Sequence, residues 1–189
     1  MVLAHSLIGV PLAYYLIKDK KEYWKDKLTL NFLFMVAIIG AVFPDFDLAL
    51  GFFIHDLNHR KLISHSVIPY LILFIFIFFL SSVFQKKEKI IKTANLIFFC
   101  SVLSHLILDY LVGGISLFAP LESSIYGLDI YFGFPENFFA SYFTSWYVFG
   151  ELFLILFSIF YIYKLREVKA VYLTLFFSFI AILMIFITR

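Results

Sequence analysis

Long apolar runs alternate with short charged clusters along the chain. The run VIPYLILFIFIFFL (67–80), for example, contains no charged residue, whereas three of the segments between such runs are rich in basic residues. A helix needs roughly 20 residues to cross the hydrocarbon core of a bilayer. The pattern therefore predicts an all-α fold, a polytopic transmembrane helical bundle. About six membrane helices are expected, at residues 2–17, 28–43, 67–84, 94–112, 146–163 and 170–187.

Two connections between the predicted helices are long. Residues 44–66 mix apolar and polar positions, and LALGFFI (48–54) suits a segment near the membrane interface. Residues 113–145 are rich in glycine and aromatic residues, so we expect them to form an interfacial cap. The whole chain, 1–189, is expected to be a single integral membrane domain. Its motif-bearing part covers 1–130, and a C-terminal helix pair covers 146–187.

The composition supports lipid as the surrounding solvent. Hydrophobic residues make up 63% of the chain, and 27 of its 189 residues are Phe. A water-soluble domain of this length has too little interior to bury so much apolar surface. The net charge of +2 implies no general attraction to nucleic acid, and the single Cys100 excludes a disulfide framework within the chain. The first apolar run precedes its lysines, which favours a retained helix over a cleaved leader.

Lysine and arginine are distributed unevenly between the two sides of this predicted bundle. The segments 18–27, 85–93 and 164–169 together hold 12 of the 15 basic residues. The positive-inside rule then places these three loops in the cytoplasm. We therefore expect an integral protein of the cell membrane with both termini outside.

Histidine and aspartate residues occur near the other ends of the predicted helices. His105 and Asp109, in SHLILDY, are four residues apart and so share one face of a helix. Ionisable groups inside a membrane helix cost at least ~2–3 kcal/mol each by insertion scales, and they usually mark a functional site. The candidate metal ligands are His5, Asp45, Asp47, His65, His105 and Asp109.

Imidazole and carboxylate ligands without thiolate suit a divalent metal, Zn²⁺ first, with Mn²⁺ or Fe²⁺ as alternatives. This number of ligands is sufficient for one or two ions. Arg60 can hold a phosphate or carboxylate oxygen by two parallel hydrogen bonds, and His59 can protonate a leaving group or bind metal. Asp45 and Asp47 cannot share a face of a regular helix, so joint ligation requires a non-helical turn at Pro44.

Each candidate also has a purely structural explanation. Asp45 and Asp47 suit the first turn of a helix that follows a proline. Lys61 suits a side chain that extends from the interface toward lipid headgroups. His105 and Asp109 could simply pair with each other.

Three functions are compatible with these residues. The first is a membrane-embedded, metal-dependent hydrolase that acts on an ester or phosphoester at the non-cytoplasmic interface, where a membrane lipid is both environment and candidate substrate. The second is a transporter or ion-conducting protein that uses the same cluster, and the third is a non-catalytic scaffold with a structural metal site. A transport path would need polar groups toward the cytoplasmic face, where the predicted helices carry only Asn31 and Asn95.

Four motifs, in this order, form a recognisable set: MVLAHSLIGVPLA, FPDFD, HRKLISHS and SHLILDYLVGGISLFAPL. Over roughly residues 1–130 they resemble the YdjM/YbcI-type membrane-bound metal-dependent hydrolases. Members of that family typically show H–R–x–x–T–H–S, and Ser64 stands here where Thr is usual. The Trp often seen before Pro120 is absent. The resemblance implies a metal-dependent hydrolase with the motif residues His5, Asp45, Asp47, His59, His65, His105 and Asp109.

Overall fold

Helices account for almost all the regular structure in the described part of this chain. The computed structural model describes residues 4–52, 59–128, 146–165 and 168–187. Within these ranges it has seven α-helices: α1 (Ala4–Ile17), α2 (Lys21–Lys25), α3 (Lys27–Val42), α4 (Val67–Leu80), α5 (Glu88–Val112), α7 (Trp146–Lys164) and α8 (Leu173–Ile187). Short 3-10 helices occur at Phe43–Phe52, His59–Lys61, Ile63–His65, Ser81–Val83 and Lys169–Tyr172.

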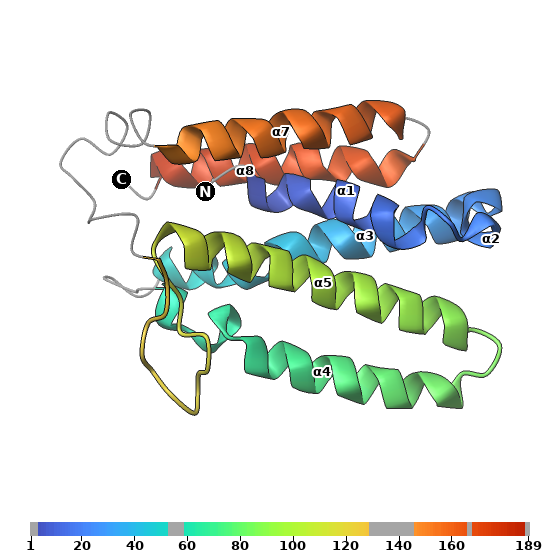
Figure 1. Ribbon diagram of the computed structural model, residues 1–189, viewed down its shortest axis with the longest axis horizontal. Helices are drawn as coiled ribbons and strands as arrows, with labels where there is room; N and C mark the ends of the chain where they lie inside the picture. The colour runs from blue at the N-terminus through green and yellow to red at the C-terminus, as the bar shows by residue number, and fades with distance from the viewer. Residues whose placement is uncertain (1–3, 53–58, 129–145, 166–167, 188–189) are drawn as a thin grey trace.

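All the α-helices except the short α2 run along the long axis of the molecule (Figure 1). The connection through α2, the turn between α4 and α5, and the turn between α7 and α8 lie together at one end. These are the three lysine-rich segments. The 3-10 segments that follow α3 and precede α4 lie at the opposite end, next to the segment that follows α5. The molecule therefore has a basic end and an end that gathers the histidine motifs.

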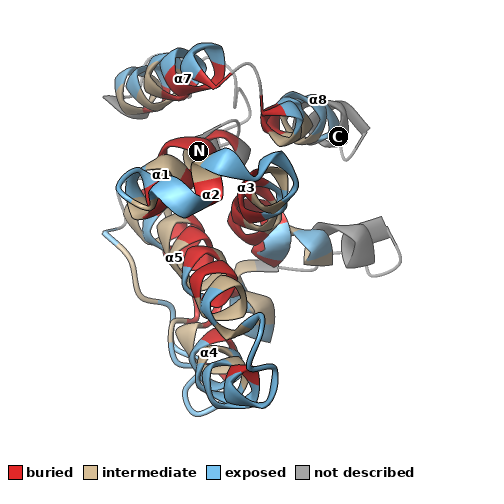
Figure 2. Ribbon diagram, turned by 90° about the vertical axis from the view of Figure 1, so that its right-hand side faces the viewer, coloured by how far each residue is buried: buried red, intermediate tan, exposed pale blue. Residues whose placement is uncertain are grey.

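The helices pack in layers (Figure 2). Helices α7 and α8 cover α1 and α3, α5 packs beneath these two, and α4 is outermost. The largest buried cluster lies between α1, α3, α5 and α7 and includes Val10, Phe34, Ile97 and Ile162. A smaller cluster around Tyr70 and Leu106 joins α4 to α5. The core is thus thickest around α1 and α3.

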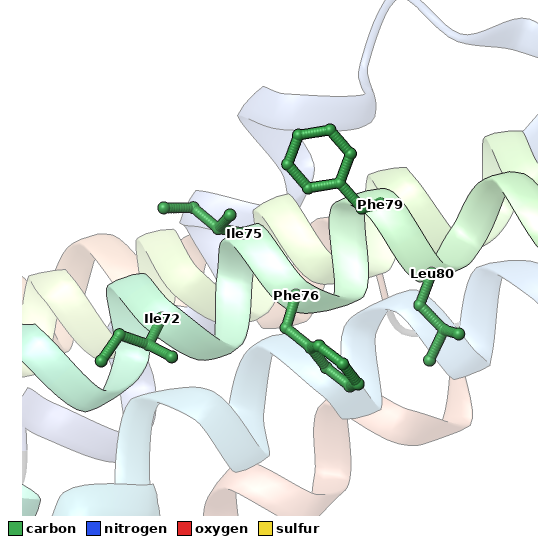
Figure 3. A pocket seen from close by; sticks show the side chains of 5 residues that line it. All are labelled: Ile72, Ile75, Phe76, Phe79 and Leu80. Atoms are coloured by element: carbon green, nitrogen blue, oxygen red, sulfur yellow. The ribbon is translucent and has the colours of Figure 1, made fainter.

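The outward face of α4 is apolar and exposed. Ile72, Ile75, Phe76, Phe79 and Leu80 line a shallow hollow on this single helix (Figure 3). Soluble proteins rarely expose so continuous an apolar surface. Lipid chains can cover it without penalty, because they are as apolar as the side chains themselves.

Among the residues that the structure describes, two helical stretches are long and apolar enough to cross a membrane. They are Lys27–Asp47, with 21 residues and a mean hydropathy of 1.8, and Glu88–Val112, with 25 residues and a mean hydropathy of 1.7. Shorter apolar helices occur at Leu7–Ile17, Val67–Val83 and Lys169–Ile180. The all-helical architecture is confirmed, whereas six membrane helices remain a prediction.

Some predicted boundaries were wrong. Helix α5 begins at Glu88 instead of residue 94, because the basic segment continues the helix and Lys92 pairs with Glu88 one turn earlier, with 2.6 Å between Nζ and Oε1. Helix α2 was not predicted. Trp24 holds this helix against the end of α1, because its Nε1 donates a hydrogen bond of 3.0 Å to the carbonyl of Ile17. Residues 129–145 of the predicted cap lie outside the described residues.

The described part of the predicted cap is hydrogen-bonded to the start of α4. Ser66 caps this helix, and its hydroxyl also donates to the carbonyl of Ala119 at 2.6 Å. Ile115 and Tyr126 form an antiparallel bridge within the segment. Gly114 permits the turn after α5 because its φ of 83° lies in the left-handed region, which L-residues with side chains rarely adopt. The segment therefore closes the end of the bundle where the histidines lie.

Candidate metal centre

Glycines bring the helices close together just below the histidine end. A Cβ at Gly9 of α1 would lie 2.7 Å from the carbonyl oxygen of Ala37 in α3. A Cβ at Gly40 of α3 would lie 2.9 Å from the carbonyl oxygen of Phe98 in α5. Only glycine allows the backbones to approach this closely. His5 lies one helical turn before Gly9, so the close contact also sets the position of its ring.

Four of the predicted ligands converge at one point. Asp45 comes from the 3-10 helix that continues α3, His65 from the 3-10 helix before α4, and His105 and Asp109 from α5. One ligand atom from each of these residues lies within 4.8 Å of all the others. Both histidines are fully buried, and the Asp109 side chain is 3% exposed, whereas the Asp45 side chain is 29% exposed. Three of the four side chains are therefore buried, and the group is accessible to solvent only at Asp45.

The nitrogen–oxygen distances in this group have the length expected around a metal ion. His65 Nε2 lies 3.7 Å from Asp45 Oδ1 and 3.4 Å from Asp109 Oδ2. His105 Nε2 lies 3.6 Å and 3.2 Å from the same two oxygens. Two ligands at ~2.1 Å from a tetrahedral Zn²⁺ are separated by about 3.4 Å. Most of these contacts are too long for good hydrogen bonds, but a shared cation would explain all four of them.

The far side of His105 is held by the backbone. Its Nδ1 lies 2.7 Å from the carbonyl oxygen of Ala41, which can only accept, so Nδ1 carries the proton. In the neutral imidazole Nε2 is then unprotonated and faces the cluster. Among the described residues, neither His105 Nε2 nor Asp109 Oδ2 has a hydrogen-bond partner, although both are buried. A bound cation would satisfy both atoms. The hydrogen bond to Ala41 fits this interpretation, because metal-ligating histidines usually donate the N–H of their other ring nitrogen to such an acceptor.

Asp47 supports His65 from outside the group. Its Oδ2 lies 3.3 Å from His65 Nδ1 and accepts a hydrogen bond from the hydroxyl of Ser64. Asp45 and Asp47 thus reach the two different nitrogens of one imidazole. Burial lowers the pKa of His65, but the surrounding carboxylates, Asp109 first, outweigh this and raise the pKa to about 11. The carboxylates around this ring therefore favour a positive charge beside them, which a bound cation could also supply.

Arg60 holds the other oxygen of Asp109. Its Nη2 lies 3.2 Å from Asp109 Oδ1, and its side chain is 27% exposed. The guanidinium lies against Gly113, where any side chain would collide with Nη1. The Arg60 carbonyl accepts a hydrogen bond of 3.0 Å from the Ser116 backbone, which ties this residue to the segment after α5.

His5 completes the cluster from α1. Its Nδ1 lies 3.6 Å from Asp45 Oδ2, and its Nε2 lies 3.8 Å from Asp109 Oδ1. Its ring is 4.1 Å from that of His105. His5 therefore contacts both carboxylates, but through oxygens that do not face His65 and His105.

The structure brings together most of the residues predicted for the site. His5, Asp45, Asp47, Arg60, His65, His105 and Asp109 lie in one cluster, within which four residues form the compact group of possible ligands. His59 begins a short 3-10 helix, but its side chain lies outside the described part of the chain. The sequence pattern did not predict three supporting features of the site: Ser64, the Ala41 carbonyl and the two glycines. A glycine one turn after His5 was the available signal for close helix packing.

An all-helical bundle with an exposed apolar face and a buried His/Asp cluster defines a helical membrane protein with a possible metal site. Comparison with protein families identifies it further: the chain belongs to the YdjM inner membrane protein family, whose model matches residues 1–189. The family resemblance is thus confirmed, and it extends beyond residues 1–130 to the whole chain. No curated protein and no solved structure matches the chain.

Proposed function

We propose that this protein is a membrane-embedded, metal-dependent hydrolase that cleaves an ester or phosphoester at the non-cytoplasmic membrane interface. The observation that carries the proposal is the set of four nitrogen–oxygen distances, 3.2–3.7 Å, between two buried imidazoles and two carboxylates. Two histidines and two aspartates suit Zn²⁺, and they also suit Mn²⁺ or Fe²⁺. When bound, such an ion acts as a Lewis acid and lowers the pKa of water toward neutrality.

The residues around this group have separable tasks in the proposal. Asp45 lies at the open side, because its side chain is the most exposed of the four, and substrate would approach there. Arg60 lies beside Asp109 and is partly exposed, so its guanidinium can orient an anionic oxygen of the substrate. His59 remains the proposed proton donor to the leaving group. The exposed apolar surface of α4 is suited to contact with lipid chains, which supports a lipid ester as substrate.

Two polar groups toward the basic end of α5 argue against a transport path. Thr93 and Asn95 are buried toward the basic end, but both have local partners. The Asn95 amide donates to the carbonyl of Phe74 at 2.8 Å, and the Thr93 hydroxyl lies 3.0 Å from that of Tyr23. A translocation path would need groups that are available to the transported ion. The partial exposure of Asp45 also favours a catalytic over a closed structural site.

Metal content is the first test of this proposal. The protein is purified in detergent without chelators, and its metals are measured per chain by inductively coupled plasma mass spectrometry. We expect about one transition-metal ion in the wild type and less than a tenth of that in His105→Ala and Asp109→Ala. Asp19→Asn is the matched control, because Asp19 is an exposed carboxylate beside α1 at the basic end. Its metal content should equal that of the wild type.

Catalysis is tested on the metal-loaded protein with p-nitrophenyl esters, bis-p-nitrophenyl phosphate and phospholipids in mixed micelles. Turnover in the wild type that falls at least ~100-fold in Asp109→Ala supports the hydrolase, in line with the loss of a transition-state interaction. Equal turnover in both proteins would remove the cluster from the reaction. A wild type without bound metal would refute the metal site itself.

A further inference from the structure

The two oxygens of each carboxylate at the centre of the cluster face different sides. Asp45 Oδ1 and Asp109 Oδ2 face the ring nitrogens of His65 and His105. We call this side the histidine face. Asp45 Oδ2 and Asp109 Oδ1 face His5 instead, at 3.6 Å and 3.8 Å. We call this side the His5 face. Carboxylates that divide their oxygens in this way are typical bridges between two metal ions.

The His5 face has the ligands for a second cation. Asp109 Oδ1 lies beside His5 Nε2, and Asp45 Oδ2 lies beside His5 Nδ1. His5 Nε2 is buried with no hydrogen-bond partner among the described residues. The residue His5 is 5% exposed, so water does not readily compensate this nitrogen. A buried donor set of this kind requires a positive charge beside it.

That charge is already supplied by the chain. Arg60 Nη2 lies 3.2 Å from Asp109 Oδ1, the same oxygen that faces His5. Gly113 leaves room for the guanidinium, and the hydrogen bond from the Ser116 backbone fixes the Arg60 carbonyl. Gly113 and Ser116, both in the segment that follows Asp109, thus hold Arg60 beside the His5 face.

The formal charges among the described residues of the site balance with one ion only. Asp45, Asp47 and Asp109 supply three negative charges, and Arg60 supplies one positive charge. One divalent ion on the histidine face brings the sum to zero when the histidines are neutral. A second divalent ion would leave two excess positive charges in a largely buried cluster, which is strongly unfavourable.

We propose that the Arg60 guanidinium occupies the position of a second metal ion, so that this site binds a single divalent ion. The inference rests on the proposed metal site but not on hydrolysis. In this arrangement the carboxylates of Asp45 and Asp109 lie between one metal ion and one arginine side chain. Removal of the arginine charge then converts the His5 face into a second metal site.

The test counts Mn²⁺ ions bound to the detergent-purified full-length chain. Protein is saturated with Mn²⁺, passed through a desalting column and analysed by mass spectrometry and electron paramagnetic resonance. We expect one ion in the wild type, with the six-line spectrum of isolated Mn²⁺. Arg60→Gln should bind two ions and show an exchange-coupled spectrum. Lys61→Gln, the matched control, removes the charge of the exposed neighbouring residue and should still bind one.

The double variant Arg60→Gln/His5→Ala identifies the second position, because it should return to one ion. Two ions in the wild type, or one in a folded Arg60→Gln, would overturn the inference while leaving the proposed hydrolase intact. If Arg60→Gln does not fold, the wild-type count decides: one ion supports the inference and two overturn it. No bound ion in the wild type would refute both the inference and the proposed function. One ion without hydrolysis would refute the proposed function alone.

Discussion

Individual side chains in this cluster are held by partners that do not belong to the group of possible ligands. His105 donates to the Ala41 carbonyl, His65 lies against Asp47, and Ser64 donates to Asp47 in turn. These contacts aim both Nε2 atoms at the same pair of carboxylates. Such outer partners commonly change metal affinity ~10–100-fold when they are removed. We therefore predict that Ser64 affects metal binding at the proposed site through Asp47 and His65.

Ser64→Ala should weaken Mn²⁺ or Zn²⁺ binding by about 10–100-fold, because Asp47 loses its hydroxyl partner and no longer fixes the His65 ring. Competition with a calibrated chelator measures this change. Ser64→Thr keeps the hydroxyl and should bind like the wild type. Ser82→Ala is the matched control, since the Ser82 hydroxyl contacts only Glu88 among the described residues, at 3.3 Å, at the basic end. Equal affinity in Ser64→Ala and wild type would contradict the positioning role.

At the scale of elements, the site depends on how closely three helices approach one another. Gly9 joins α1 to α3, and Gly40 joins α3 to α5. The cluster takes His5 from the first of these helices, Asp45 from the extension of the second and His105 from the third. A small increase in either spacing would move the ligand atoms apart, because a metal site tolerates errors of only a few tenths of an ångström.

Gly40→Ala should destabilise the protein by ~1–3 kcal/mol, as overpacking usually does. Its Cβ would lie 2.9 Å from the Phe98 carbonyl oxygen and 3.1 Å from the Ser101 Cβ, so α3 and α5 must separate. We expect a lower thermal unfolding temperature in detergent and a lower metal occupancy. Leu28→Ala changes an 81% exposed residue of α3 and serves as the control. An unchanged metal content in Gly40→Ala would show that the site does not require this spacing.

At the scale of the whole molecule, the two ends differ in chemistry. The basic end gathers three lysine-rich segments, and two of its acids are engaged locally: Glu22 pairs with Lys89 at 2.6 Å, and Asp26 caps α3. The other end carries the cluster of histidines and aspartates. This polarity agrees with the positive-inside rule and predicts that the metal centre lies near the non-cytoplasmic surface.

Cysteine labelling tests this orientation directly. In a Cys100→Ser background, Lys87→Cys marks the basic end and Glu122→Cys marks the end with the His/Asp cluster, and both positions are exposed. A membrane-impermeant maleimide should label Glu122→Cys in intact spheroplasts but Lys87→Cys only after lysis. The reverse pattern would place the proposed hydrolase site in the cytoplasm.

Helix positions were predictable because hydropathy is a local property of the chain. The apolar run of α4 and the i,i+4 pair in α5 could be identified without knowledge of any neighbour. The start of α5 was misplaced, since lysines suggested a loop while the Glu88–Lys92 pair stabilises helix. The short α2 was missed because its five residues are too few for a hydropathy period, and it is held by a hydrogen bond from Trp24 to the end of α1.

The sequence by itself determined which residue types reach the histidine end, because hydropathy and helical period place His5, Asp45, His65 and Asp109 at the same level. Only the tertiary structure decided which partner each nitrogen and oxygen atom of the cluster faces. It separates the role of Asp45 from that of Asp47, and it divides the oxygens of Asp109 between two histidines and Arg60. The physical reason is that these orientations depend on close helix contacts and on hydrogen bonds between residues far apart in the chain. Patterns of neighbouring residues carry no record of such contacts.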